Sequence, residues 1–361
     1  MNAISRRQTW WLVLILIGLI LLGVRIALPG WVTDAVNRNL ADIGEYRGQV
    51  GGVALHLWRG AYSIEDLHIE KRTGKVPVPL IDAPRTDLTV SWPAVLHGAV
   101  QARVTFESPE INFVDANGSA EAQSGKGVDW RAQLEDLLPI RLDEVLIHNG
   151  TVHFRNFSTH PKVDVVATSV EGRVQNLSNA RDETERAADL DFTATVLGDA
   201  ALQSTAQFDP LGKLDDFKFS LKIDRLRLQH LNDLLQAYVK VDVESGEGEF
   251  VMELEARDGQ LHGYAKPLFR DVQVFSWKHD VEQQGDNPLR AAWEALAGAL
   301  ENLFKNQPKD QFATRIEING PIGDAKTSTL QAIGAILHNA FVEAYRPQFE
   351  HLPERREDKR A

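Results

Sequence analysis

The first strongly patterned segment of the chain is an unbroken apolar run close to the N-terminus. Residues 10–28 read WWLVLILIGLILLGVRIAL, and thirteen of these nineteen residues are Leu, Ile or Val. As a helix, such a run is about 28 Å long, which is enough to cross the hydrocarbon core of a bilayer. We therefore expect a transmembrane helix, with tryptophans at the interfaces and an arginine reaching out of the apolar region. The residues that define this anchor are Trp10, Trp11, Leu16, Leu22, Arg25 and Trp31.

A cleaved signal peptide is the competing interpretation of the same run, because Arg6 and Arg7 precede it. The residues that follow include bulky Trp31 and show no small-x-small cleavage pattern, which favours an uncleaved anchor. The flanking charges leave the orientation almost balanced, since Arg25 and Arg38 lie at the far end of the run.

Apolar residues recur at helical spacing just after this run. Val36, Leu40 and Ile43 share one face, and Gly44 ends the pattern. Residues 29–44 are therefore predicted to form a short amphipathic helix. Two positions suit such a helix, the membrane surface and the end of a sheet, and the end of a sheet is the simpler.

Between about Gln49 and Ile318 the dominant period changes to two. This alternation is typical of antiparallel strands that are apolar on one face and polar on the other. Parallel strands buried on both faces read instead as continuous apolar runs. The alternating positions are Val53, Leu55 and Leu57; Leu190, Phe192, Ala194 and Val196; Phe217, Phe219, Leu221 and Ile223; Phe250, Met252 and Leu254; and Phe312, Thr314, Ile316 and Ile318.

Turn signals separate these strands. Asn149-Gly150 and Asp258-Gly259 both suit the two-residue hairpin turn that requires positive φ. Residues 116–127 are polar and rich in Gly and Ser, which predicts a flexible loop, and residues 178–186 are similar.

Two amphipathic helices are expected near the C-terminus. The first begins at Pro288 and carries an apolar stripe as far as Phe304. The second runs from Leu330 to Tyr345 and is followed by Pro347.

These elements predict an α+β, mostly β protein. It consists of a single N-terminal transmembrane helix and an extended, curved, groove-like antiparallel β-sheet, with amphipathic helices near both ends of the chain. The predicted organisation is a cytoplasmic stub (1–9), the transmembrane helix (10–28), the amphipathic helix (29–44), a β-rich domain (45–350) and a charged, disordered tail (351–361).

Composition narrows the classes of partner. The chain has 361 residues, a formal net charge of -12 and no cysteine. The negative charge argues against nucleic acid as a partner, because phosphate binding needs a basic face. The lack of cysteine excludes disulfides, thiolate metal sites and cysteine nucleophiles.

No motif predicts an enzyme, a metal site or a cofactor. The SGKG at residues 124–127 lacks the first glycine and the following Ser or Thr of a phosphate loop. His148, His153 and His160 cluster in the sequence, but no further metal ligand can be nominated. Exposed histidines on a strand are the favoured interpretation.

The apolar face of the predicted sheet is the remaining candidate site. If part of it stays open, the face forms a trough suited to acyl chains. The alternative, favoured on general grounds alone, is a sheet packed shut by the terminal helices. The residues predicted to line the groove are Leu55, Leu57, Phe217, Phe219, Leu221, Phe250, Met252 and Leu254.

A set of ordered stretches runs through most of the chain. They are the anchor followed by LPGWVTDAVNRNL, then VALHLWRGAYSIEDLHIEKRTGKVPVPLIDA, VTFESPEINFVD, LLPIRLDEVLIHNGTVHFRNF, FSLKIDRLRLQHLNDLLQAYVKVDVESGEGEF, EARDGQLHGYAKPLFRDVQVF and LHNAFVEAY. In these stretches the chain resembles the AsmA-like superfamily of bacterial envelope proteins, most closely its membrane-anchored domain-of-unknown-function 748 branch.

The resemblance implies an inner-membrane anchor with a cytoplasmic N-terminus and a periplasmic domain. It also implies a β-rich groove linked to lipid transfer or outer-membrane homeostasis, with the bilayer and phospholipid as partners. It supplies no catalytic residue. The alternative function is a structural or assembly factor that binds another envelope protein through its sheet edge or helices.

Overall fold

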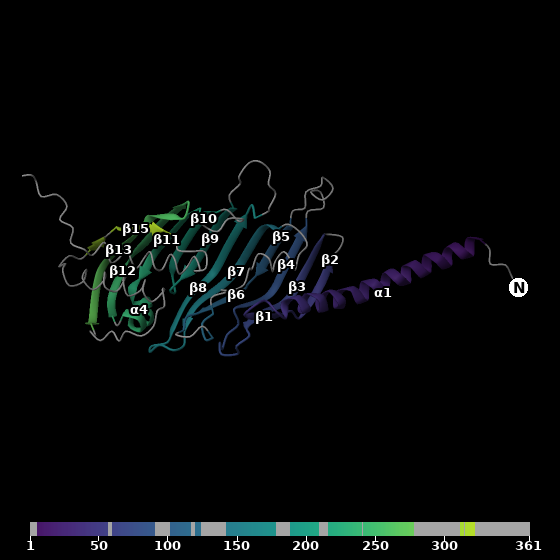
Figure 1. Cartoon of the computed structure of the whole chain (residues 1–361), viewed down its shortest axis with the longest axis horizontal. Helices are drawn as coiled ribbons and strands as arrows, with labels where there is room; N and C mark the ends of the chain where they lie inside the picture. Colours follow the sequence, from purple (N-terminus) through teal and green to yellow (C-terminus); the bar gives the residue numbers. More distant parts are fainter. Residues whose placement is uncertain are drawn as a thin grey trace, which may run out of the picture.

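One long, twisted β-sheet with few helices makes up the described part of the protein (Figure 1). The computed structural model describes residues 6–56, 60–90, 102–116, 120–123, 142–177, 188–208, 216–239, 241–277, 311–313 and 315–321. The mostly β fold predicted from the alternating pattern is thus confirmed.

The helices are α1 (Arg6–Leu40), the short 3-10 helix η2 (Leu228–Leu231) and α4 (Asn232–Val239). The strands are β1 (Tyr46–Gln49), β2 (Gly52–His56), β3 (Ala61–Lys71), β4 (Ile81–Val90), β5 (Ala102–Glu107), β6 (Glu110–Val114), β7 (Leu142–Asn156), β8 (Val163–Gln175), β9 (Ala188–Val196), β10 (Ala200–Phe208), β11 (Phe217–Arg227), β12 (Val241–Arg257), β13 (Gln260–Trp277), β14 (Gln311–Ala313) and β15 (Ile316–Pro321).

Within the described residues the sheet has 15 strands and is mixed, so the prediction of an antiparallel sheet is wrong for two of its pairings. Its main order is β1-β3-β4-β5-β7-β8-β9-β10-β11-β12-β13-β14, while β2 pairs with β3, β15 with β13, and β6 with both β4 and β7. The pairings of β5 with β7 and of β6 with β7 are parallel. The connection from β6 to β7, residues 115–141, is long enough for the crossover that a parallel pair requires.

Helix α1 is one continuous element, whereas the sequence suggested a helix at 10–28 and another at 29–44. Pro29 lies inside it, and the helix ends at Leu40 instead of Gly44. Figure 1 shows α1 extending away from the end of the sheet. Among the side chains that the structure describes, no helix presents a stretch long and apolar enough to cross a membrane.

The C-terminal end of α1 closes the first end of the sheet. Val36 and Leu40 are buried in a core with Ile43 and Tyr46 and with apolar side chains of β2 to β5. The apolar spacing that predicts the 29–44 helix is therefore the pattern that packs onto these strands.

A second core lies under η2 and α4. Leu228 and Leu235 pack against Val170, Val196 and Phe269 from β8, β9 and β13. Figure 1 places α4 beside β8 and β12, at one end of the strands. The two cores thus cover different portions of the sheet.

The two predicted hairpin turns have different outcomes. Asp258 and Gly259 both have positive φ and join β12 to β13, with Arg257 opposite Gln260, so this hairpin is confirmed. The prediction of a hairpin at Asn149-Gly150 is wrong, because strand β7 continues through both residues. The positive φ of Asn149 belongs to a β-bulge, at which the register between β7 and β8 shifts.

Side chains around this bulge satisfy its displaced backbone groups. The Glu171 carboxylate accepts hydrogen bonds from the Asn149 backbone N–H and the His148 ring, at 2.9 and 3.0 Å. The Asn149 side chain donates to the Ser108 hydroxyl, where the chain passes from β5 to β6. An Asn-Gly pair therefore serves a bulge as readily as a turn when neighbouring strands supply these partners.

Part of the predicted flexible loop at 116–127 is fixed to the sheet. Gln123 is fully buried, pairs with Val114 through the backbone and donates to the Asn112 carbonyl at 3.0 Å. The Lys71 ammonium donates a hydrogen bond to the Ala122 carbonyl, and the Thr73 hydroxyl donates one to the Ala120 carbonyl. The expected loop at 178–186, the helices at 288–304 and 330–345 and the tail at 351–361 lie outside the described residues.

A buried carboxylate joins the strands next to the parallel pair. Glu144 on β7 is hydrogen-bonded to Arg103 on β5 and to Arg173 and Gln175 on β8. Its side chain is only 7% exposed. Burial works against its ionisation, but the hydrogen bond and charge of Arg103, with the charge of Arg173, hold the pKa of Glu144 below its usual value.

We predict that Glu144→Gln destabilises the protein by about 1–2 kcal/mol at pH 7, because the two arginines lose their charged partner. A depressed pKa stabilises the fold above the ordinary carboxyl pKa, and this contribution disappears as the pH falls through the folded-state pKa. The difference between wild type and variant should therefore shrink below about pH 4 in urea titrations. The exposed Glu244→Gln is the control, and a difference that is constant with pH contradicts the ionic role of Glu144.

Close strand contact at Gly263 gives a second test of the fold. A Cβ there would lie 2.1 Å from the Glu253 carbonyl oxygen, whereas one at Gly52 of β2 would meet only the Glu65 carboxylate at 3.7 Å. We predict that Gly263→Ala lowers the free energy of unfolding by about 1–3 kcal/mol, because β12 and β13 must move apart. Gly52→Ala should be neutral within about 1 kcal/mol. Equal denaturation midpoints for the two variants would contradict this packing.

Candidate functional site

Strand register places one unbroken row of apolar residues across the sheet. Residues directly opposite one another in paired strands point to the same face, so the row can be followed from strand to strand. Twelve strands contribute one residue each, and every member is apolar apart from the hydroxyl of a tyrosine. The row is Leu55, Tyr62, Leu88, Val104, Val145, Val174, Leu190, Ala206, Phe219, Leu254, Gly263 and Ile318.

A second row, two residues along each strand, runs parallel to the first. It is Val53, Ile64, Thr86, Phe106, Ile147, Gly172, Phe192, Ser204, Leu221, Met252 and Ala265, of which Thr86 and Ser204 carry hydroxyl groups. With adjacent strands about 4.8 Å apart, the two rows form an apolar band about 50 Å long. We call these two rows the apolar band.

The opposite face is polar over β9 to β13. The intervening residues of β9 to β13 are Asp189, Asp191, Thr205, Gln207, Lys218, Ser220, Glu253, Glu255, His262 and Tyr264. Across β9 to β13 the sheet therefore has one mainly apolar face and one polar face.

Burial changes along the apolar band. At its first end Leu88 and Val104 are buried in the core that α1 closes, and burial raises the pKa of Tyr62 above its usual range. At the other end Leu254 and Ile318 are buried. Between them, Val145, Val174, Leu190, Ala206 and Phe219 are only partly buried. Ile147 and Phe192 of the second row pack against the core under η2 and α4, so the first row between Val145 and Phe219 is the part of the band most accessible to a ligand.

The structure brings six of the eight predicted groove residues together. Phe217, Phe219 and Leu221 of β11 lie beside Phe250, Met252 and Leu254 of β12 on one face, with Phe219 opposite Leu254 and Leu221 opposite Met252. Leu55 lies on the same face at the first end of the band, packed against the α1 core. Leu57 lies outside the described residues.

The prediction missed much of the band because bulges change the phase of the alternation. In β7 the apolar residues are odd-numbered before Asn149, as at Val145 and Ile147, and even-numbered after it, as at Val152. Ser169 in β8 has a similar effect. For Leu190 and Phe192 no bulge intervenes, and simple alternation was a sufficient signal.

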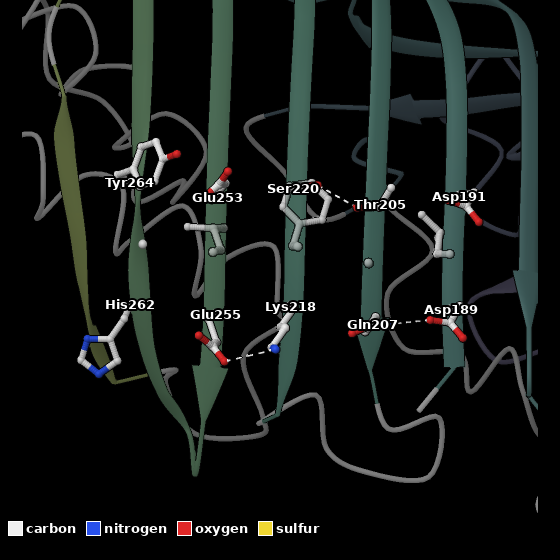
Figure 2. Close-up of a pocket in the computed structure, with 15 residues that line it drawn as sticks. Asp189, Asp191, Thr205, Gln207, Lys218, Ser220, Glu253, Glu255, His262 and Tyr264 are labelled. Carbon is white, nitrogen blue, oxygen red and sulfur yellow. Dashed lines mark hydrogen bonds and ion pairs between the residues drawn. The ribbon is translucent and has the colours of Figure 1, made fainter. Parts of the chain in front are cut away.

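A hollow of about 640 Å³ lies against β9 to β13 (Figure 2). Three consecutive residues of each strand line it: two polar residues that share the polar face and, between them, a band residue such as Phe219 or Leu254, whose side chain points to the other face. Most of its polar groups are engaged with neighbours: Gln207 with Asp189 at 2.9 Å and Lys218 with Glu255 at 3.9 Å.

The hydroxyl groups that line the hollow are hydrogen-bonded to neighbouring side chains, and the bond between Tyr264 and Glu253 raises the pKa of Tyr264 above its usual value. The Ser220 hydroxyl is hydrogen-bonded to Thr205 at 2.7 Å, and the His262 ring to Asn319 at 3.0 Å. Neither contact activates a hydroxyl for attack.

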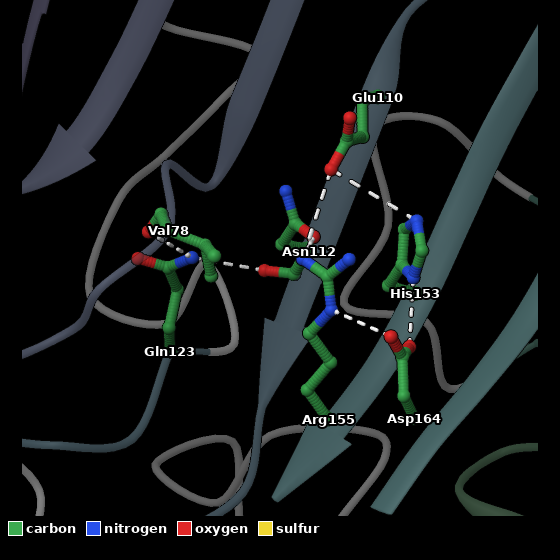
Figure 3. Close-up of polar contacts among 7 residues, drawn as sticks. All are labelled: Val78, Glu110, Asn112, Gln123, His153, Arg155 and Asp164. Atoms are coloured by element: carbon green, nitrogen blue, oxygen red, sulfur yellow. Dashed lines mark hydrogen bonds and ion pairs between the residues drawn. The ribbon is translucent and has the colours of Figure 1, made fainter. Parts of the chain in front are cut away.

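Two of the three clustered histidines, His148 and His153, belong to ion pairs of the sheet. His153 lies between Asp164, at 2.7 Å, and Glu110, at 3.9 Å, beside Arg155 (Figure 3). Its side chain is 13% exposed, so the expectation of an exposed histidine is wrong at this position. In the part of the chain that the structure describes, no group of three His, Asp or Glu side chains is arranged so that it could hold a metal ion.

The residues of the predicted anchor all lie on α1. Trp10, Leu16, Leu22 and Trp31 are 70%, 57%, 53% and 65% exposed. Arg25 is also exposed, and the side chain of Trp11 is outside the described set. All the large hydrophobic side chains that are exposed in the described residues lie on α1.

Comparison with known proteins adds no relative. No protein-family model matches the chain, and no curated protein matches it.

Proposed function

We propose that the protein binds or passes the acyl chains of lipids along the apolar band and does so without catalysis. The observation that carries this proposal is the unbroken row of apolar residues across twelve paired strands. A packed core needs apolar residues only where another layer covers them. A linear ligand such as an acyl chain, by contrast, needs apolar contact along a continuous path.

Partial burial in the middle of the band supports the same proposal. A surface this apolar is costly to expose to water, at roughly 25 cal/mol for each Å². Val174, Leu190 and Phe219 are nevertheless only partly buried. Bound acyl chains would cover the apolar surface that is still exposed to water, and they need no hydrogen-bonding partners.

We further propose that α1 anchors the protein in a bilayer. The sequence of residues 10–28 and the exposed Trp10, Ile15, Leu19 and Leu22 support this role, because such side chains are stable in contact with lipid. The resemblance to AsmA-like envelope proteins supports an inner-membrane anchor and a periplasmic sheet.

Substitution at Phe219 tests the proposed function. We expect Phe219→Glu to reduce binding of a fluorescent phospholipid at least about tenfold, because a carboxylate on the apolar band must be desolvated by each acyl chain. Ser220→Glu is the matched control, since it adds the same charge at the neighbouring position on the polar face. Binding is measured by fluorescence transfer from labelled vesicles to the full chain.

Circular dichroism separates the possible outcomes. A folded Phe219→Glu protein that binds lipid as well as wild type would contradict the proposal. Unfolding of this variant alone, with no lipid bound by wild type, would identify Phe219 as core and favour a scaffold for another envelope protein.

A further inference from the structure

A second hollow lies where α1 meets the first end of the apolar band. Its volume is about 430 Å³, within the range of small-ligand sites. Leu22, Arg25, Ile26 and Pro29 line it from one face of α1, and Leu55 and His56 line it from β2. The spacing of three and four residues places these four α1 side chains on one face of the helix.

The hollow connects two surfaces of different kinds. Leu22 and Ile26 belong to the exposed apolar surface of α1, and Ile26 is 73% exposed. Leu55 is the first residue of the apolar band and lies opposite Tyr62. A ligand in the hollow therefore contacts both the proposed membrane-spanning surface and the start of the band.

The charge of the hollow selects the chemistry of its ligand. Arg25 lines it, and none of the residues that line it is acidic. Within the described residues Arg25 forms no ion pair, unlike the arginines of the sheet, such as Arg103 and Arg173, which hold Glu144. A guanidinium that projects from an apolar helix surface and has no protein carboxylate is suited to a phosphate, which it can bind through two parallel hydrogen bonds.

We propose that this hollow is the portal through which a phospholipid passes between the bilayer and the apolar band. Its phosphate binds the Arg25 guanidinium, the His56 ring donates a further hydrogen bond, and an acyl chain lies over Ile26 and Leu55. Arg25 sits near the end of the apolar run, at the depth where lipid phosphates meet the hydrocarbon core. This inference rests on the proposed function, because the portal matters only if the band receives acyl chains.

The test uses the full chain reconstituted in vesicles of phosphatidylethanolamine and phosphatidylglycerol. A small fraction of the phosphatidylglycerol carries a photoactivatable acyl chain, and mass spectrometry maps the labelled peptides. Labelling of α1 reports membrane insertion, labelling of β2 reports the portal, and labelling of β11 reports the band.

Arg25→Gln is the decisive variant. We expect it to lower labelling of β2 and β11 about tenfold relative to α1, because the lipid phosphate loses a charged partner. Arg25→Lys should retain most of the labelling. Arg38→Gln is the matched control, since it removes the same charge from an exposed position of α1 that does not line the hollow. Filling the hollow with Ile26→Trp should lower the same two signals while leaving the charge unchanged.

The outcomes distinguish the portal from the proposed function. If Arg25→Gln and Ile26→Trp both label β2 and β11 as well as Arg38→Gln does, the portal is refuted. Wild-type labelling of β11 without β2 refutes the portal and leaves lipid binding in the band intact. Wild-type labelling confined to α1 refutes both.

Discussion

The hydrogen-bond register between strands is the constraint on which the rest of this structure depends. Side chains alternate between faces along a strand, so a slip of one residue in any pairing would move the apolar residues of that strand to the polar face. Eleven successive pairings, one of them parallel, keep Leu55 and Ile318 on the same side of the sheet. The apolar band exists only because none of them slips.

Bulges allow this register to coexist with a strongly twisted sheet. Positive φ at Asn149, Ser169 and Arg225 marks positions where an extra residue is inserted without moving the following apolar residues to the wrong face. The polar face supplies the partners that such irregularities need, as Glu171 does for Asn149. Glu144 similarly links β5, β7 and β8 around the parallel pair. Polar contacts on one face thus position the apolar residues on the other.

The sequence was most informative where alternation was uninterrupted. Phe217 to Leu221 and Phe250 to Leu254 were predicted as groove residues, and they form one patch across β11 and β12. Leu55 was predicted as well, but most of the band between Leu55 and Phe217 was not, because bulges change which parity faces inward and periodicity carries no information about pairing. The parallel pairing of β7 with β5 and β6 could not be predicted either, because periodicity does not show which strands are neighbours.

The ends of the chain show a different limit of sequence reasoning. The spacing of Val36 and Leu40 indicated a helix that packs on the sheet, but the continuity of α1 through Pro29 contradicts the usual expectation that proline ends a helix. At Gln123 the polar composition suggested a flexible loop, yet buried backbone groups of β6 needed partners and the loop supplied them.

The most direct test of the central claim is a photo-crosslinking scan of the two faces in living cells. A photoreactive amino acid is placed at Val174, Leu190 or Phe219 on the apolar band, and at Arg173, Asp191 or Ser220 on the polar face. The account predicts lipid adducts, identified by mass spectrometry, at the first three positions and none at the second three. Adducts at neither set, or equally at both, would contradict it.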